Sequence, residues 1–153
     1  MSWLEHKIPP PVVGALCGLL MWGISTQTVA INWWGFTAQA ITGLLVLSGL
    51  FLDSGGLLSF IRSKTTINPV KIENASALVT GGVYRFTRNP MYLGMALLLT
   101  ALAVWLQTPL AFVGPVLFVG YITRFQIIPE ERALQKLFGQ EYLDYSQRVR
   151  RWL

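Results

Sequence analysis

Residues 91–128 read MYLGMALLLTALAVWLQTPLAFVGPVLFVGYITRFQII, two apolar runs that are separated only by the neighbourhood of Thr108. A helix needs about 20 predominantly apolar residues to cross a hydrocarbon core about 30 Å thick. The two runs therefore predict membrane spans at about 91–106 and 109–128, joined as a tight helical hairpin. Pro115 lies inside the second run, where a membrane helix tolerates a kink.

Two further apolar runs precede this hairpin. Residues 12–31 carry no charge and are followed by Trp33 and Trp34, as expected where a span meets the headgroup region. Residues 36–61 form the next run and continue past Asp53. We therefore predict an all-α integral membrane protein, with four transmembrane helices in a single domain over residues 1–153.

The composition agrees with a chain that is solvated mainly by lipid. Of the 153 residues, 53% are hydrophobic and 12% are charged, whereas soluble domains are about 25% charged. The net charge of +5 would suggest nucleic acid if it lay on one soluble face. Because the basic residues flank the apolar runs, lipid headgroups and topology explain them better, and we expect no nucleic-acid partner.

The basic residues also predict an orientation. All 12 Lys and Arg lie before the first span, between Arg62 and Arg88, or from Arg124 onward, and the connections around Asn32 and Thr108 carry none. Four spans put the basic segments on one side, which the positive-inside rule makes cytoplasmic, together with both termini. The first eleven residues make a poor signal peptide, and the short chain suggests a prokaryotic inner membrane.

Two segments on the predicted cytoplasmic side are too polar to insert. Residues 63–90 are too long for a simple turn and form a structured connector. The tail, residues 129–153, opens with Pro129, Glu130 and Glu131, which suit the first turn of a helix. It then predicts an amphipathic helical segment in two parts, with Gly139 as the break. Its apolar positions are Leu134, Leu137 and Phe138 before that glycine, and Tyr142, Tyr145 and Val149 after it.

The connector and the tail each carry half of a longer pattern. Leu78–Gly94 reads LVTGGVYRFTRNPMYLG, and the tail contains the acidic pair at residues 130–131, then Phe-Gly-Gln-Glu-Tyr at 138–142 and Arg-Val at 148–149. The two halves, in this order and with a helical hairpin between them, resemble the signature of the isoprenylcysteine carboxyl methyltransferase and phospholipid methyltransferase superfamily. The first two predicted spans carry no such specific pattern.

This resemblance implies a methyltransferase with an S-adenosylmethionine site at the cytoplasmic membrane surface. The chemistry of the side chains agrees, because Glu130 could pair with the ammonium of the methyl donor and Arg88 or Arg85 with its carboxylate. Tyr84 and Tyr92 could face the sulfonium or stack on the adenine. The expected contacts with the methyl donor are Ser76, Ala77, Leu78, Val79, Tyr84, Arg88, Asn89, Pro90, Met91, Tyr92, Gly94, Glu130 and Glu131.

Each of these residues also has an ordinary role when taken alone. Acidic residues are common in the first turn of a helix, arginines anchor spans, and tyrosines gather at membrane interfaces. Asp53 could be interfacial or form a wall of the acceptor pocket, and the sequence favours the interface. Cys17 suggests a buried small hydrophobe, His6 a solvated terminus, and no cluster of ligands predicts a metal.

The acceptor stays open at this stage. Where isoprenylcysteine methyltransferases place a substrate-binding arginine, this chain has Gln126, and Arg124 lies two residues earlier as a possible replacement. A neutral amide does not replace a guanidinium in binding an anion. The acceptor could therefore be a lipid amine, a small apolar alcohol, thiol or acid, or a foreign amphiphile. The alternatives to a methyltransferase are an NADPH-dependent membrane reductase of related architecture and a non-catalytic protein that binds a lipid or a partner.

Overall fold

The computed structural model describes residue 5 and residues 7–33, 35–63 and 77–153. Every regular element within these ranges is helical, which confirms the all-α prediction. Short 3-10 turns precede α3 and α4, and a π-helical turn joins α4 to α5. The elements are α1 (Pro10–Gln27), α2 (Phe36–Ser63), a 3-10 turn (Gly82–Arg85), α3 (Pro90–Trp105), a 3-10 turn (Pro109–Phe112), α4 (Val113–Ile122), the π turn (Thr123–Ile127), α5 (Ile128–Phe138) and α6 (Gln140–Arg148).

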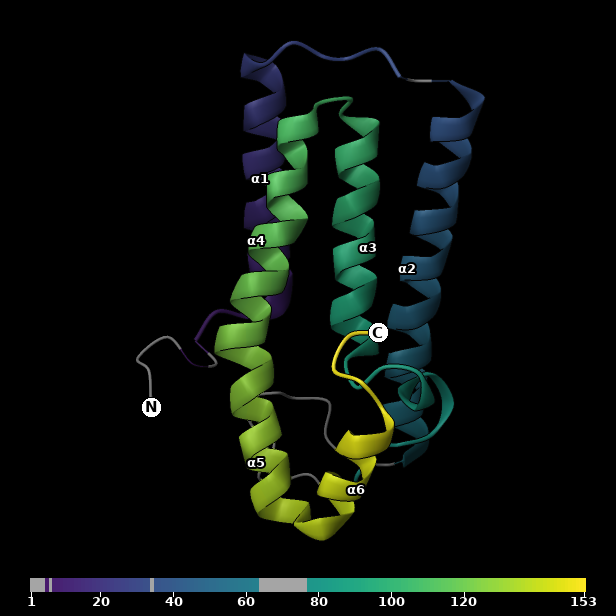
Figure 1. The fold of residues 1–153 in the computed structure, drawn as a ribbon, viewed down its shortest axis with the longest axis vertical. Helices are drawn as coiled ribbons and strands as arrows, with labels where there is room; N and C mark the ends of the chain where they lie inside the picture. The colour runs from purple at the N-terminus through teal and green to yellow at the C-terminus, as the bar shows by residue number, and fades with distance from the viewer. Residues whose placement is uncertain (1–4, 6, 34, 64–76) are drawn as a thin grey trace.

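Helices α1 to α4 run in alternating directions along the bundle, and α3 lies between α2 and the pair formed by α1 and α4 (Figure 1). The α1–α2 connection and the α3–α4 turn lie at one end of the bundle, while α5 and α6 lie at the other. The described basic residues before α1, at the end of α2, before α3 and after α4 therefore all belong to the α5–α6 end. Which side of a membrane this end faces stays a prediction.

Two continuous helices within the described ranges are long and apolar enough to cross a membrane, by length and composition. They are α2, over Phe36–Ser63, and the helix that runs through α4 and α5, over Pro109–Phe138. The predicted spans 36–61 and 109–128 fall on these two helices. The predicted spans 12–31 and 91–106 fall on α1 and on the shorter apolar helix α3, and they remain predictions.

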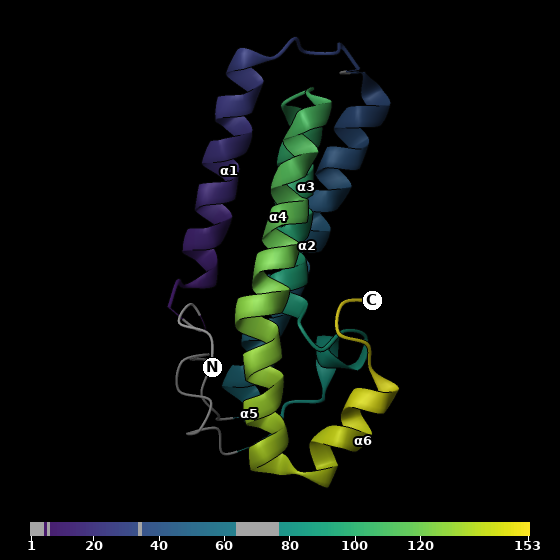
Figure 2. The ribbon, with the colours of Figure 1, turned by 60° about the vertical axis from the view of Figure 1, so that its left-hand side comes forward.

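The fourth helix does not stop where the tail was expected to begin. Helical backbone continues from α4 through the π turn into α5, as Figure 2 shows. Pro129 lies in the first turn of α5. Proline has no N–H to donate to the carbonyl four residues earlier, and its ring crowds that carbonyl. The wider π turn directly before it accommodates this defect without breaking the helix.

Helix α1 packs against α3 and α4, and α2 packs mainly against α3. Met21 of α1, Ala103 of α3 and Phe118 of α4 are fully buried in the core between α1, α3 and α4. The contact between α2 and α3 is made by Gly49 and Gly94, where the absence of side chains lets the two backbones approach.

The tail folds over the connector beside this pair of helices. Gly139, at φ +53°, reverses the chain between α5 and α6, a conformation that favours glycine. Leu137 was expected to lie on one apolar stripe with Leu134 and Phe138, but it is 44% exposed and does not pack with them. The residues that form this small core are Tyr142, Tyr145, Val149, Leu134, Phe138 and Leu78.

Candidate functional site

A cavity of about 670 Å³ lies where α2, the connector, α3, α5 and α6 meet. Its volume falls in the range of small-molecule sites, about 300–1,000 Å³. Ten of the residues expected to contact a methyl donor line it, from both halves of the sequence pattern. They are Ala77, Leu78, Val79, Tyr84, Arg88, Asn89, Met91, Tyr92, Glu130 and Glu131.

The remaining expected contacts lie outside this lining. Pro90 is buried at the start of α3, and Gly94 is buried one turn further along, against α2. Gln126 is buried, and its amide donates a hydrogen bond to Glu130. Arg124 is an exposed residue of the π turn. Ser76 lies outside the described residues, as does His6.

Glu130 forms the polar centre of the cavity wall. Its Oε1 accepts a hydrogen bond of 2.6 Å from the Tyr92 hydroxyl and one of 2.9 Å from the amide of Gln126. Both donors are neutral, and no cation of the described chain lies within ion-pair distance of this carboxylate. A half-buried carboxylate without a cation is costly, so this wall favours a ligand with a positive charge.

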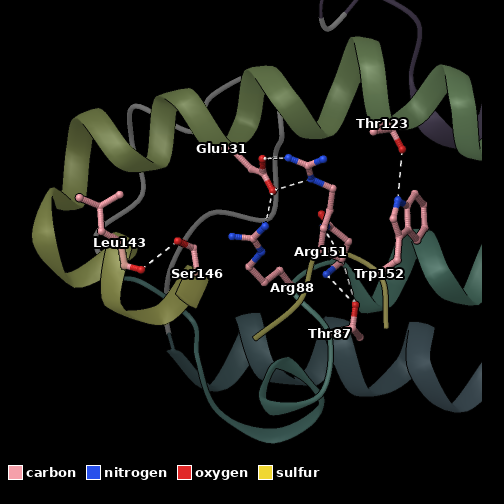
Figure 3. Close-up of polar contacts among 9 residues, drawn as sticks. Thr87, Arg88, Thr123, Glu131, Leu143, Ser146, Arg151 and Trp152 are labelled. Carbon is pink, nitrogen blue, oxygen red and sulfur yellow. Dashed lines mark hydrogen bonds and ion pairs between the residues drawn. The ribbon is translucent and has the colours of Figure 1, made fainter. Parts of the chain in front are cut away.

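Glu131 presents the opposite situation, because two arginines hold it (Figure 3). Arg88 contacts Oε1 at 2.9 Å, and the guanidinium of Arg151 donates to both carboxylate oxygens, at 2.9 and 2.6 Å. Arg151 was not among the expected site residues. Two guanidiniums against one carboxylate leave a net positive charge beside the cavity, and the buried Nε of Arg88 has no hydrogen-bond partner among the described residues.

The last five residues return from α6 to the connector and to α4, and we call residues 149–153 the C-terminal strap. The carbonyl of Arg151 accepts hydrogen bonds from the Asn89 amide, at 2.9 Å, and from the Thr87 hydroxyl. The N–H of Arg88 donates to the carbonyl of Arg150. The Trp152 indole donates to the Thr123 hydroxyl (Figure 3). The strap therefore fixes the connector residues that precede α3.

Tyr84 and Tyr145 join the connector to α6 within the cavity wall. The Tyr145 hydroxyl donates to the carbonyl of Tyr84 at 2.8 Å, and both side chains are buried. Burial raises the pKa of both phenols above their ordinary value, and for Tyr84 the negative charge of Glu130 adds to this effect. Both phenols therefore stay neutral hydrogen-bond donors at any physiological pH.

Asp53 lies in the cavity wall, the role that the sequence favoured less, and its position relative to a membrane interface stays a prediction. It is on α2, opposite Gly94 of α3, where any Cβ would collide with the Asp53 carboxylate. Its Oδ1 is buried and has no hydrogen-bond partner within the part of the chain that the structure describes. A lone acid in an apolar run was the signal in the sequence, because ionisable residues within spans usually have a function.

Sequence reasoning missed most of the apolar lining. Leu50, Asp53, Ser54 and Leu57 recur at helical spacing and form one face of α2, but that face looks like any apolar face of a span. Only the packing of α2 against α3, with α5 on the other side of the cavity, turns this face into a cavity wall. The other lining residues that were not expected are Pro10, Pro11, Phe60, Met95, Ile127, Leu134, Tyr142 and Tyr145.

The two residues expected to bind the acceptor do not line the cavity. The Arg124 guanidinium lies 3.7 Å from the Glu5 carboxylate and stacks over the Phe125 ring at 5.5 Å from its centroid. Gln126 is 3% exposed and orients Glu130 from behind. Their role toward an acceptor remains a prediction.

Known proteins resemble most of this chain. The family model for phospholipid methyltransferase matches residues 37–141, which include the ten expected contacts that line the cavity. Protein-S-isoprenylcysteine O-methyltransferase A of Arabidopsis thaliana is 32% identical over 121 residues, covering 77% of this chain and 58% of the relative. The human protein-S-isoprenylcysteine O-methyltransferase is 32% identical over 114 residues, covering 74% and 40%.

A shorter relative matches the chain at higher identity. An uncharacterized protein of Haemophilus influenzae is 48% identical over 63 residues, which are 41% of this chain and all of that protein. The chain thus spans about half the length of the plant and human methyltransferases that it matches. With the family model covering more than half of its residues, the chain belongs to the phospholipid methyltransferase family, within the superfamily that its two motifs resemble.

Proposed function

We propose that this protein transfers a methyl group from S-adenosylmethionine to a lipophilic acceptor at the cytoplasmic surface of a membrane. One observation carries the proposal: the two separate halves of the family pattern line one cavity, joined by the 2.6 Å hydrogen bond between Tyr92 and Glu130. The plant and human relatives are methyltransferases by name.

The polar wall suits the groups of the methyl donor. Glu130, which has only neutral donors around it, would hold the ammonium. Arg88, whose Nε is unpartnered within the described residues, would hold the carboxylate. Tyr84, a buried neutral phenol, would contact the adenosine or the sulfonium. The methyl donor supplies an electrophilic methyl on sulfur, and the protein has to align an acceptor with it and exclude water.

The apolar wall suits an acceptor that arrives from the bilayer. Leu50 and Leu57 of α2 line the cavity and are 52% and 41% exposed, so this wall continues to the outer face of the bundle. Transfer between a polar pocket and an apolar wall keeps the reacting groups away from bulk water.

Calorimetry with the protein in detergent tests the first part of this proposal. We expect wild type to bind S-adenosylmethionine and S-adenosylhomocysteine, and Glu130→Gln to weaken binding of the methyl donor at least tenfold. Glu141→Gln, the same change at an exposed position of α6 away from the cavity, should leave affinity unchanged.

The outcome separates this function from its rivals. Binding of NADPH in place of S-adenosylmethionine would indicate a reductase, and binding of neither nucleotide would indicate a non-catalytic protein. A screen of membrane lipids and small amphiphiles with radiolabelled methyl donor would then identify the acceptor. If Glu141→Gln lost as much affinity for S-adenosylmethionine as Glu130→Gln, the result would contradict the role of Glu130 in binding the methyl donor.

A further inference from the structure

A second groove, of about 390 Å³, lies beside the cavity, between the connector and the end of α6. Tyr145 lines both spaces, and its hydroxyl is already used in the hydrogen bond to the carbonyl of Tyr84. The other lining residues of the groove are Thr80, Gly81, Arg85, Arg148 and Val149. The proposed function uses neither of the two arginines in this set.

These two arginines have no acidic partner in the described part of the chain. No carboxylate there lies within ion-pair distance of Arg85 or Arg148. Asp144, one turn before Arg148 on α6, accepts a hydrogen bond from Gln140 with its carboxylate and one from Arg148 only with its backbone carbonyl. Arg85 was one of two arginines considered for the carboxylate of the methyl donor, but it does not line the cavity. Two guanidiniums in one groove attract an anion.

The groove lies at the depth where α2 is predicted to leave the hydrocarbon. A Cβ at Gly82 would come within 2.9 Å of the Ser59 hydroxyl. Ser59 is two residues before the predicted end of this span at residue 61, which is about 3 Å along a helix. The turn Gly82–Arg85 therefore lies against the last turns of the predicted span, as Figure 1 shows for the lower half of α2.

The surroundings of the groove suit a headgroup with an apolar chain attached. A guanidinium can pair with two oxygens of a phosphate through parallel hydrogen bonds. At Gly81 the groove is open, because an added Cβ would meet no described atom within 4 Å outside its chain neighbours. Phe86, directly after Arg85, is 76% exposed, and an exposed aromatic ring at this depth suits the boundary between headgroups and acyl chains. A free phosphate has no use for this ring, whereas a phospholipid does.

We propose that this groove binds the phosphate of an anionic membrane lipid, with Arg85 and Arg148 as its ligands and Phe86 against its acyl chains. The lipid is bound beside the cavity and needs no group that accepts a methyl. The predicted orientation puts the groove in the cytoplasmic leaflet, where anionic lipids attract basic segments. This inference goes beyond the proposed function and does not depend on the methyl donor or its acceptor.

Lipid binding to the full-length protein, measured by native mass spectrometry in a non-ionic detergent, tests this assignment. Phosphatidylglycerol, which is anionic and carries no amine, would be titrated alongside phosphatidylcholine, whose phosphate is neutralised by a quaternary ammonium. Wild type should bind phosphatidylglycerol at least tenfold more tightly. Arg85→Gln and Arg148→Gln should each weaken its binding at least threefold and together abolish the preference, while the affinity for S-adenosylmethionine stays within twofold of wild type.

Arg150→Gln is the matched control for this experiment. It removes the same charge from an exposed arginine two residues after Arg148 that does not line the groove, and it should keep the preference for phosphatidylglycerol. Thermal midpoints show which variants fold. Arg85→Lys and Arg148→Lys serve as second variants, because they keep the charge but lose the paired hydrogen bonds, and they should still weaken binding. Inorganic phosphate and glycerol 3-phosphate, added as soluble competitors, should not displace the lipid.

Four results would overturn the proposal. Equal affinity for the two lipids would show that the groove does not recognise a net negative charge. An equal loss in Arg150→Gln would assign lipid binding to the general charge of this end of the bundle. Displacement by a soluble phosphate would indicate a free anion as the ligand, and loss of S-adenosylmethionine binding in Arg85→Gln would assign Arg85 to the methyl donor. A wild type that prefers phosphatidylglycerol but binds no S-adenosylmethionine would refute the proposed function and support the lipid site.

Discussion

Gly94 is a single residue on which both the helix contact and the cavity depend. Gly94→Ala would place a methyl group against the Asp53 carboxylate and the Gly49 carbonyl. We expect it to destabilise the protein by about 1–3 kcal/mol, the usual cost of overpacking a tight site. Gly43→Ala, also in a helix and with open space around it, should not lower the thermal midpoint in detergent. Equal losses in the two variants would contradict the close contact.

Tyr145 offers a second test at this scale. Tyr145→Phe removes the 2.8 Å hydrogen bond to the carbonyl of Tyr84 and leaves that carbonyl unsatisfied. We expect a loss of about 1 kcal/mol in the free energy of unfolding, together with weaker binding of S-adenosylmethionine by calorimetry. Tyr121→Phe is the control, since the buried Tyr121 hydroxyl has no partner among the described residues. A loss as large in Tyr121→Phe would show that the effect is not the hydrogen bond.

The sequence could predict residues of the site only where they belong to a motif. Tyr92 and Glu130 were predicted from a pattern of residues that does not require knowledge of the fold, and they meet in the structure. Arg151 and Asp53 could not be assigned in this way. Arg151 looks like one more basic residue of the tail, and its role depends on the return of the chain to Glu131. Asp53 depends on which face of α2 meets the cavity.

At the scale of elements, the C-terminal strap is the feature that hydropathy could not predict. Its hydrogen bonds to the connector are accepted by the backbone carbonyls of Arg150 and Arg151, and a backbone group has no sequence signature. The helices were easier to predict, because the length of each apolar run indicates a helix that could span a membrane. The π turn before Pro129 was missed, since proline was taken to mark the start of a helix rather than a defect within one.

Removing the strap tests its role. Deletion of residues 150–153 would remove the bonds to Asn89, Thr87 and Thr123 and one of the two arginines on Glu131. We expect helix content by circular dichroism to persist and the affinity for S-adenosylmethionine to fall at least tenfold, because the connector loses its support. Deletion of the exposed Leu153 alone should change neither. Full affinity in the longer deletion would refute a supporting role for the strap.

At the scale of the whole molecule, the alternating directions of α1 to α4 predict a topology that can be measured. Single cysteines at Ala30, in the α1–α2 connection, and at Gln140, at the start of α6, would be introduced with Cys17→Ala. We expect a membrane-impermeant maleimide to label the Ala30 variant in intact bacterial spheroplasts and the Gln140 variant only after lysis. The two positions reacting from the same side would contradict the predicted four spans.

The contact between Gly49 and Gly94 also determines where an acceptor can enter. Side chains can change rotamer to open a passage. At Gly49 and Gly94 the backbones of α2 and α3 meet directly, so no side chain there can move aside to let a molecule pass between the two helices. Across the cavity, Pro10 and Pro11 at the start of α1 face the lining of α2, and α1 packs against α3 and α4 instead. The proposed acceptor therefore has to enter the cavity elsewhere than between α2 and α3.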